Sequence, residues 1–167
     1  MKEGFGKLIS LTEALRTLEG VARRFEGAEV LPLMEAAGRI TAEAVKSGVD
    51  VPHFRRAAMD GYAVRAADTV GASPDNPVRL RVIADLAAGY VADKEVVPGT
   101  AIRIMTGAPI PTGADAVVRF EQTKQDGDYV EIMTAVPVGK DVRLAGEDVR
   151  AGETVIPRGT ILRPPEI

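Results

Sequence analysis

Apolar residues near the N-terminus recur at intervals of three and four positions, the spacing that places them on one face of an α-helix. Ser10 and Glu13 have the spacing of a capping box. We therefore expect a helix from Ser10 to Phe25, with an apolar stripe formed by Leu11, Ala14, Leu15, Leu18, Val21, Ala22 and Phe25. Because the stripe covers one face only, it is expected to pack against a further domain or a second subunit.

The pattern changes after this helix. A short helical piece is predicted over residues 33–37, ended by Gly38, and residues 39–46 can run as a strand. Beyond Ser47, glycines and prolines separate short runs rich in β-branched residues, which are typical of β-strands. These runs are Val78–Ile83, Thr100–Met105, Ala116–Arg119, Tyr129–Met133 and Val155–Ile156. The expected fold class is therefore α+β, mainly β with a few helices.

Two loop-like segments stand out in the β-rich part. In the first, Asp60 and Gly61 precede the alternating Tyr62 and Val64. This order predicts a tight turn that enters a strand, because Gly adopts positive φ freely and Asp tolerates turn geometry. The second segment, residues 103–115, contains a Thr-Gly pair and further Pro and Gly residues. Taken alone, the first segment indicates no more than a turn.

The composition narrows the classes of site. The chain has 167 residues, of which 46% are hydrophobic and 27% charged, as in folded globular proteins of one or two domains. The absence of cysteine excludes disulfides, thiolate catalysis and Cys-based metal sites. The single histidine, His53, is expected in a surface loop, because a lone histidine makes a poor metal site.

Charge and hydropathy limit the kinds of binding partner that we expect. The net charge is −3, with acidic and basic residues interleaved, so no nucleic-acid partner is expected. No apolar run approaches the roughly 20 residues that span a bilayer, and no membrane partner is expected. The first residues lack the apolar core of a signal peptide, so we expect the protein to be cytoplasmic.

Three motifs together resemble the molybdopterin molybdenumtransferase family, which comprises MoeA of bacteria and archaea and the E domain of gephyrin. They are residues 59–64 (MDGYAV), residues 103–109 and 113–118 (RIMTGAP and GADAVV), and residues 142–149 (VRLAGEDV). The motifs occur in the family's order and spacing, and the similarity covers essentially the whole chain.

The resemblance implies a particular domain arrangement. Residues 1–46 and 141–167 would form an elongated, discontinuous outer domain, into which a small β-rich domain of residues 47–140 is inserted. Family members are much longer, so the α/β domain that cradles the pterin and a last β-barrel domain are expected to be absent from this chain. Because the family's proteins are homodimers with the site between subunits, this chain would supply one wall of the site and be inactive alone.

The implied reaction is insertion of molybdate into the dithiolene of adenylylated molybdopterin, with Mg²⁺-dependent hydrolysis of the adenylate and release of AMP and the molybdenum cofactor. The resemblance assigns Asp60, Thr106 and Asp148 to catalysis. Mg²⁺ takes oxygen ligands and usually bridges carboxylates to substrate phosphates. Asp60, Asp148 and Glu121 are therefore the candidate metal ligands.

Binding of the anionic substrates requires donors and positive charge. The Thr106 hydroxyl and the amides of the Gly107 turn are expected to form an anion nest for molybdate or phosphate. Arg103 and Arg143 would add planar, permanently charged groups suited to oxyanions. Together with Gly61, residues Gly107 and Arg143 are assigned to cofactor binding.

Several of these residues have simpler interpretations. Asp60 can be a turn former, and Glu147 can be a solvated turn carboxylate. Arg103 can lie on the exposed face of a strand, because it falls in an alternating pattern. Asp115 is expected to cap or close a loop.

One segment departs from the family. Members usually carry an acidic or amide residue and then a serine shortly before the Met-Asp-Gly-Tyr motif, whereas this chain has Arg55-Arg56-Ala57. The hydroxyl is absent and two positive charges are added, which indicates altered anion handling or a divergent paralogue.

A second functional class stays open, namely a non-catalytic dimerisation or scaffold module, as gephyrin suggests. A scaffold needs neither Asp60 nor Asp148, whereas the enzyme needs both. A third class, a small carbohydrate-binding domain, is disfavoured because the chain has no Trp and only 4% aromatic residues for stacking on sugars.

Overall fold

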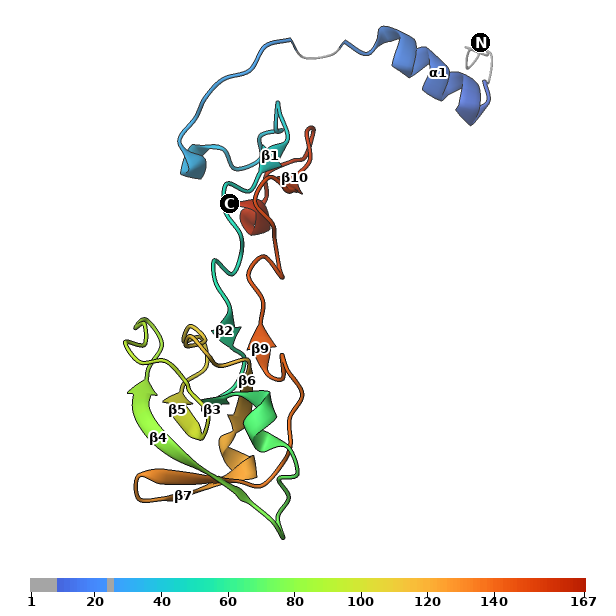
Figure 1. Ribbon diagram of the computed structural model, residues 1–167. Helices are drawn as coiled ribbons and strands as arrows, with labels where there is room; N and C mark the ends of the chain where they lie inside the picture. The colour runs from blue at the N-terminus through green and yellow to red at the C-terminus, as the bar shows by residue number, and fades with distance from the viewer. Residues whose placement is uncertain (1–8, 24–25) are drawn as a thin grey trace, which may run out of the picture. The chain divides into compact units, whose positions relative to one another are not determined.

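The computed structural model describes residues 9–23 and 26–167 (Figure 1). The chain divides into two compact units, one formed by residues 1–42 with 161–167 and the other by residues 43–160. The domain limits given by the family resemblance, at residues 46/47 and 140/141, stay a prediction. No helix in the described part of the chain is long and apolar enough to cross a membrane.

The first unit contains the N-terminal helix, α1 (Leu11–Val21). The backbone amide of Glu13 donates to Ser10 Oγ over 3.2 Å, which confirms the predicted N-cap. The helix ends at Val21 because Ala22 adopts an extended conformation, so it is shorter than predicted, and Phe25 lies outside the described residues. The side chains of its apolar stripe are 50–76% exposed at Leu11, Leu15, Leu18 and Val21.

The rest of the first unit joins segments from opposite ends of the sequence. The Gly38 amide donates to the Leu162 carbonyl at 2.7 Å, and the Leu162 amide donates to the Arg39 carbonyl at 2.8 Å. Two 3₁₀ turns, η1 (Leu33–Glu35) and η4 (Pro164–Glu166), flank this contact. The predicted helical piece near residue 33 is thus confirmed. The predicted strand over residues 39–46 is reduced to an isolated bridge at Ile40 and the short strand β1 (Val45–Lys46).

The second unit is built on a six-stranded sheet with the order β6-β3-β5-β4-β8-β7 (Figure 1). Neighbouring strands are antiparallel except for β4 and β5, which are parallel. The strands are β3 (Gly61–Val64), β4 (Val78–Leu86), β5 (Thr100–Ile104), β6 (Ala116–Arg119), β7 (Thr123–Asp126) and β8 (Tyr129–Ile132). The 3₁₀ turns η2 (Ala66–Thr69) and η3 (Phe120–Gln122) follow β3 and β6.

Two short antiparallel pairs complete the second unit. They are β1 (Val45–Lys46) with β10 (Thr154–Ile156), and β2 (Arg56–Ala57) with β9 (Val142–Arg143). The mainly β fold class with a few helices is confirmed. Every run of β-branched residues predicted as a strand overlaps one.

Apolar side chains cover both faces of the sheet. Because successive residues of a strand point to opposite faces, Tyr62 and Val64 belong to one buried cluster while Ala63 belongs to the other. The same alternation holds in β6, where Val117 and Val118 divide between the two clusters. The middle of the sheet is therefore a rigid support whose strand ends hold the loops described next.

Candidate functional site

The motif residues Asp60 and Thr106 meet at one end of the sheet. Asp60 directly precedes β3 and Thr106 follows β5, and these antiparallel neighbours pair Gly61 with Ile104. Asp60 Oδ1 accepts two hydrogen bonds from Thr106, one from the backbone amide and one from Oγ1, each 2.7 Å long. Both residues are exposed. Two of the motifs thus contribute one residue each to a single surface pair.

The pair favours the ionised form of Asp60. The hydrogen bond from the Thr106 hydroxyl, followed by that from the Thr106 amide, holds the pKa of the Asp60 carboxyl below its usual value, and the charge of Arg103 acts in the same direction. Among the described residues, no donor reaches the second oxygen, Oδ2. That oxygen is available to a cation or to a donor from a substrate.

Gly61 is needed for a different reason than the sequence indicated. Its backbone does not have the positive φ expected of a turn glycine. Instead, a Cβ at this position would overlap the carbonyl oxygen of Val118 in the adjacent β6. The predicted strand after Asp60 is thus confirmed, whereas the positive φ expected of Gly61 is wrong, because Gly61 is the first residue of β3. Its assignment to cofactor binding stays a prediction.

The hydrogen-bond donors of the turn after β5 already have acceptors within the protein. Gly107 has φ of 86°, a conformation that favours glycine. Its amide donates to the Ala57 carbonyl at 2.9 Å, and the Ala108 amide donates to the Met105 carbonyl at 3.0 Å. With the Thr106 amide and hydroxyl directed to Asp60, the donors expected to form an anion nest are already used inside the protein. An oxyanion would have to displace Asp60 from Thr106 to bind there.

A second group of charged residues lies on the loop after β9. Arg143 Nη1 donates to Glu147 Oε1 at 2.5 Å, and the Leu144 amide donates to Glu147 Oε2 at 3.0 Å. The Leu144 amide first, and then Arg143, lowers the pKa of Glu147 below its usual value. Glu147 therefore orients the Arg143 guanidinium. The sequence left Glu147 as a possible solvated carboxylate, and only its four-residue spacing from Arg143 could have signalled the pair.

Asp148 is exposed beside this pair. Its backbone amide donates to the Val51 carbonyl at 2.9 Å. After the larger effect of Glu147, the charge of Asp148 adds to the raised pKa of Arg143. Within the described ranges, no hydrogen bond or ion pair joins Asp148 to Asp60. Asp148 thus belongs to the Arg143 loop and not to the Thr106 turn.

Strand β2 lies between the two groups. On one side, Arg56 and Ala57 pair with Arg143 and Val142 of β9. On the other side, the Ala57 amide donates to the Ala108 carbonyl at 2.9 Å, next to the Thr106 turn. Ala57 is 1% exposed. The segment that departs from the family therefore joins the two groups and fills a buried position there.

The remaining candidates lie apart from these groups or have structural partners. Arg103 Nη1 is 3.5 Å from Asp85 Oδ1, and its guanidinium lies 5.0 Å from the Phe120 ring centroid. Asp115 Oδ1 accepts from the Ala66 amide at 2.6 Å, which confirms its role in closing a loop. His53 is exposed.

The metal assignment rests on few ligands. Glu121 is exposed in η3, and its charge acts on Arg119. Among residues 9–23 and 26–167 there is no group of three or more His, Asp or Glu side chains placed to hold a metal ion. A Mg²⁺ site of one or two carboxylates completed by substrate phosphates is compatible with this arrangement, and the free Oδ2 of the ionised Asp60 fits such a site.

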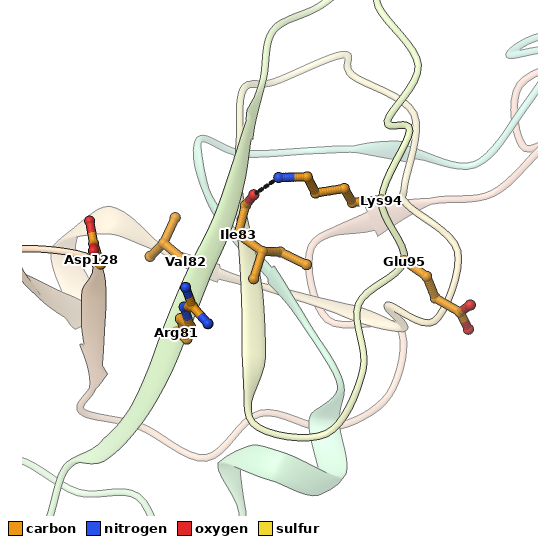
Figure 2. Close-up of a pocket in the computed structure, with 6 residues that line it drawn as sticks. All are labelled: Arg81, Val82, Ile83, Lys94, Glu95 and Asp128. Carbon is orange, nitrogen blue, oxygen red and sulfur yellow. Dashed lines mark hydrogen bonds between the residues drawn. The ribbon is translucent and has the colours of Figure 1, made fainter.

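A separate hollow of about 580 Å³ lies on β4, away from the predicted site residues. It is lined by Arg81, Val82, Ile83, Lys94, Glu95 and Asp128. Figure 2 shows Lys94 reaching the Ile83 carbonyl, a hydrogen bond of 2.7 Å, while Glu95 points away. Because charges of both signs surround apolar side chains, the hollow indicates no single ligand chemistry.

Comparisons with known proteins agree with the motifs. The chain is 48% identical over 134 residues to molybdopterin molybdenumtransferase 2 of Mycobacterium tuberculosis, covering 80% of this chain and 33% of that protein. It is 39% identical over 137 residues to the molybdopterin molybdenumtransferase of Synechococcus elongatus, covering 81% and 34%. The chain thus spans about a third of the length of these curated relatives.

A solved structure shares the fold. The crystal structure of the molybdopterin biosynthesis moeA protein from Pyrococcus horikoshii OT3 matches with a TM-score of 0.90 at 45% identity, over 96% of this chain and 42% of that chain. The family model described as MoeA N-terminal region (domain I and II) matches residues 9–167. On fold, motifs and sequence together, the chain belongs to the MoeA N-terminal region family.

Proposed function

We propose that this chain is the N-terminal part of a molybdopterin molybdenumtransferase, which inserts molybdate into adenylylated molybdopterin and releases AMP during molybdenum cofactor biosynthesis. The observation that carries the proposal is the Asp60–Thr106 pair, because it joins side chains from two family motifs on an exposed surface. The names of the relatives support the same reaction. The chain alone supplies one wall of the site and is inactive.

We assign the site residues to two parts of the substrate, its phosphates and another anionic group. Asp60, through its free Oδ2, and Asp148 on the Arg143 loop would supply the one or two carboxylates that a Mg²⁺ ion bound to substrate phosphates needs, and the ion would neutralise charge on those phosphates. Arg143, oriented by Glu147, binds an anionic group of the pterin substrate. Thr106 holds Asp60 in the orientation that leaves Oδ2 free.

The remaining parts of the proposal concern the whole protein. We propose that it is a homodimer in which a partner subunit's α/β domain faces this wall. We also propose that turnover depends on Mg²⁺, because this ion commonly joins one or two carboxylates, such as those of Asp60 and Asp148, to substrate phosphates.

The test is turnover of adenylylated molybdopterin to molybdenum cofactor by the full-length protein, with Mg²⁺ and low molybdate. We expect Asp60→Asn and Asp148→Asn to lower kcat by at least about a hundredfold while thermal unfolding stays unchanged, because the roles assigned to these carboxylates require their charge. Asp126→Asn, a carboxylate at the other edge of the sheet, is the matched control. Unchanged turnover in both site variants would contradict the assignment of the site.

One observation favours a second function. The apolar stripe of α1 is exposed in the described structure, as an interface helix of a dimerisation or scaffold module would be. Such a protein needs neither carboxylate. Full-length protein that dimerises but shows no turnover under the conditions above would support the scaffold or a divergent paralogue instead of the enzyme.

A further inference from the structure

Asp141 and Arg119 form an ion pair beside the Asp60 loop. Arg119 Nε donates to Asp141 Oδ2 and Arg119 Nη2 donates to Asp141 Oδ1, both at 2.8 Å. The Asp141 side chain is 9% exposed, and Lys140 Nζ lies 3.7 Å from Oδ2. This two-bond geometry is the strongest and most directional form of Arg–carboxylate pairing. No motif of the sequence pointed to either residue.

The backbone of Asp141 has an unusual conformation. Among the described residues, Asp141 is the one non-glycine residue with positive φ, at 52°. Asp and Asn adopt this region more easily than other residues with a side chain. The conformation lets Asp141 direct its carboxylate to Arg119 while its carbonyl oxygen accepts from the Ala58 amide at 2.9 Å.

The pair is connected to Asp60 from both sides. Upstream of Asp60, the Ala58 amide is held by Asp141. Downstream, Gly61 pairs with Arg119 in the sheet, and the Phe120 amide donates to the Asp60 carbonyl at 3.3 Å. The Asp60 side chain itself is exposed, so packing does not fix it. Its position depends on the backbone that these contacts hold and on the two hydrogen bonds from Thr106.

The same pair also sets the start of β9. Asp141 directly precedes Val142 and Arg143, whose pairing with β2 places the Arg143–Glu147 group. We propose that the Arg119–Asp141 ion pair is a positioning pair that fixes the Asp60 loop and the Arg143 strand relative to each other, so that both can engage one substrate. The role in turnover rests on the function proposed above, whereas the positioning of the loop does not.

The test uses three variants of the full-length protein. Asp141→Asn keeps a residue that tolerates positive φ and removes the charge, so backbone strain does not confuse the result. Arg119→Lys keeps the charge and loses the two-bond geometry. Asp126→Asn is the control, because Arg79 Nη2 and Asp126 Oδ2 also join two strands, at 2.9 Å, far along the sheet order from β3.

The first readout is hydrogen exchange of peptides that contain the Ala58 and Thr106 amides. In Asp141→Asn we expect these amides to exchange at least about tenfold faster, with β4 and β8 unchanged. Arg119→Lys should show a smaller effect, and Asp126→Asn none. Unchanged exchange at Ala58 and Thr106, or an equal loss of protection across the whole sheet, would overturn the positioning role.

The second readout is the split between KM and kcat. Misplacing the two groups should raise the KM for adenylylated molybdopterin about tenfold or more in Asp141→Asn. The increase should be smaller in Arg119→Lys, and Asp126→Asn should keep the wild-type KM. An unchanged KM and kcat would overturn the proposal for the reaction. If wild-type protein shows no turnover, the proposed function fails, and hydrogen exchange still decides the positioning role.

Discussion

In β3 every residue from Gly61 to Val64 is buried, whereas Asp60, immediately before it, is exposed. The sheet is positioned by apolar packing on both faces, and the loops at its end are positioned by hydrogen bonds and ion pairs such as Arg119–Asp141. The stability contributed by apolar packing depends little on salt and pH, whereas that contributed by charged contacts near the surface depends on both. We therefore expect substitutions in the two regions to differ in how much stability they remove and in whether that loss depends on pH and salt.

The largest effect is expected where the sheet has no spare volume. Gly61→Ala would force the new Cβ into the Val118 carbonyl, so we expect a loss of about 3 kcal/mol in the free energy of unfolding. Chemical denaturation measures it. Gly48→Ala is the matched control, because nothing lies within 4 Å of a Cβ at Gly48 and its φ is not positive. Equal stability of the two variants would show that β3 and β6 separate at little cost.

A smaller, pH-dependent effect is expected in the loops. Arg119 holds the pKa of Asp141 below its usual value in the folded protein. The pair's contribution to stability is therefore fully present above the usual carboxyl pKa and is lost as the pH falls through the lower folded value. Denaturation midpoints measured from neutral to acidic pH should fall less steeply for Asp141→Asn than for wild type. Parallel curves would mean that the pair adds nothing to stability.

The smallest effect is expected at an exposed side chain of β4, Arg79. Arg79 lies 4.2 Å above the Tyr129 ring and forms an exposed ion pair with Asp126. Arg79→Ala should cost less than about 1 kcal/mol, since exposed ion pairs and cation–π contacts contribute little. Raising the salt concentration should reduce the difference from wild type. A loss comparable to that of Gly61→Ala would remove the distinction between core and surface drawn above.

The same distinction separates what the sequence could predict from what it could not. Runs such as Ala116–Arg119 carry the β-branched signal of a buried strand, and the structure has a strand over the same residues. Strand β7, with the sequence Thr-Lys-Gln-Asp, was missed because it is a polar strand stabilised by pairing with β8. The two-residue strands β2 and β9 are too short for any periodicity to reveal.

The candidate site was predictable only in part. Motif resemblance selected Asp60 and Thr106, and the structure joins them by two hydrogen bonds. The sequence did not indicate the pair of Asp141 and Arg119, because the two residues are brought together by the tertiary fold and by the positive φ of Asp141, which no local pattern predicts. The positive φ expected of Gly61 is wrong, and the sequence could not indicate the close approach of β6 because that contact is a property of the assembled sheet.

The contact between residues 38–40 and 161–162 has a consequence for protein synthesis. The backbone hydrogen bonds from Gly38 to Leu162 and from Leu162 to Arg39 join segments that leave the ribosome far apart in time. The first unit cannot complete this pairing until the whole second unit has been translated. Because contacts between residues distant in sequence form slowly, the unit that begins the chain is expected to finish folding last.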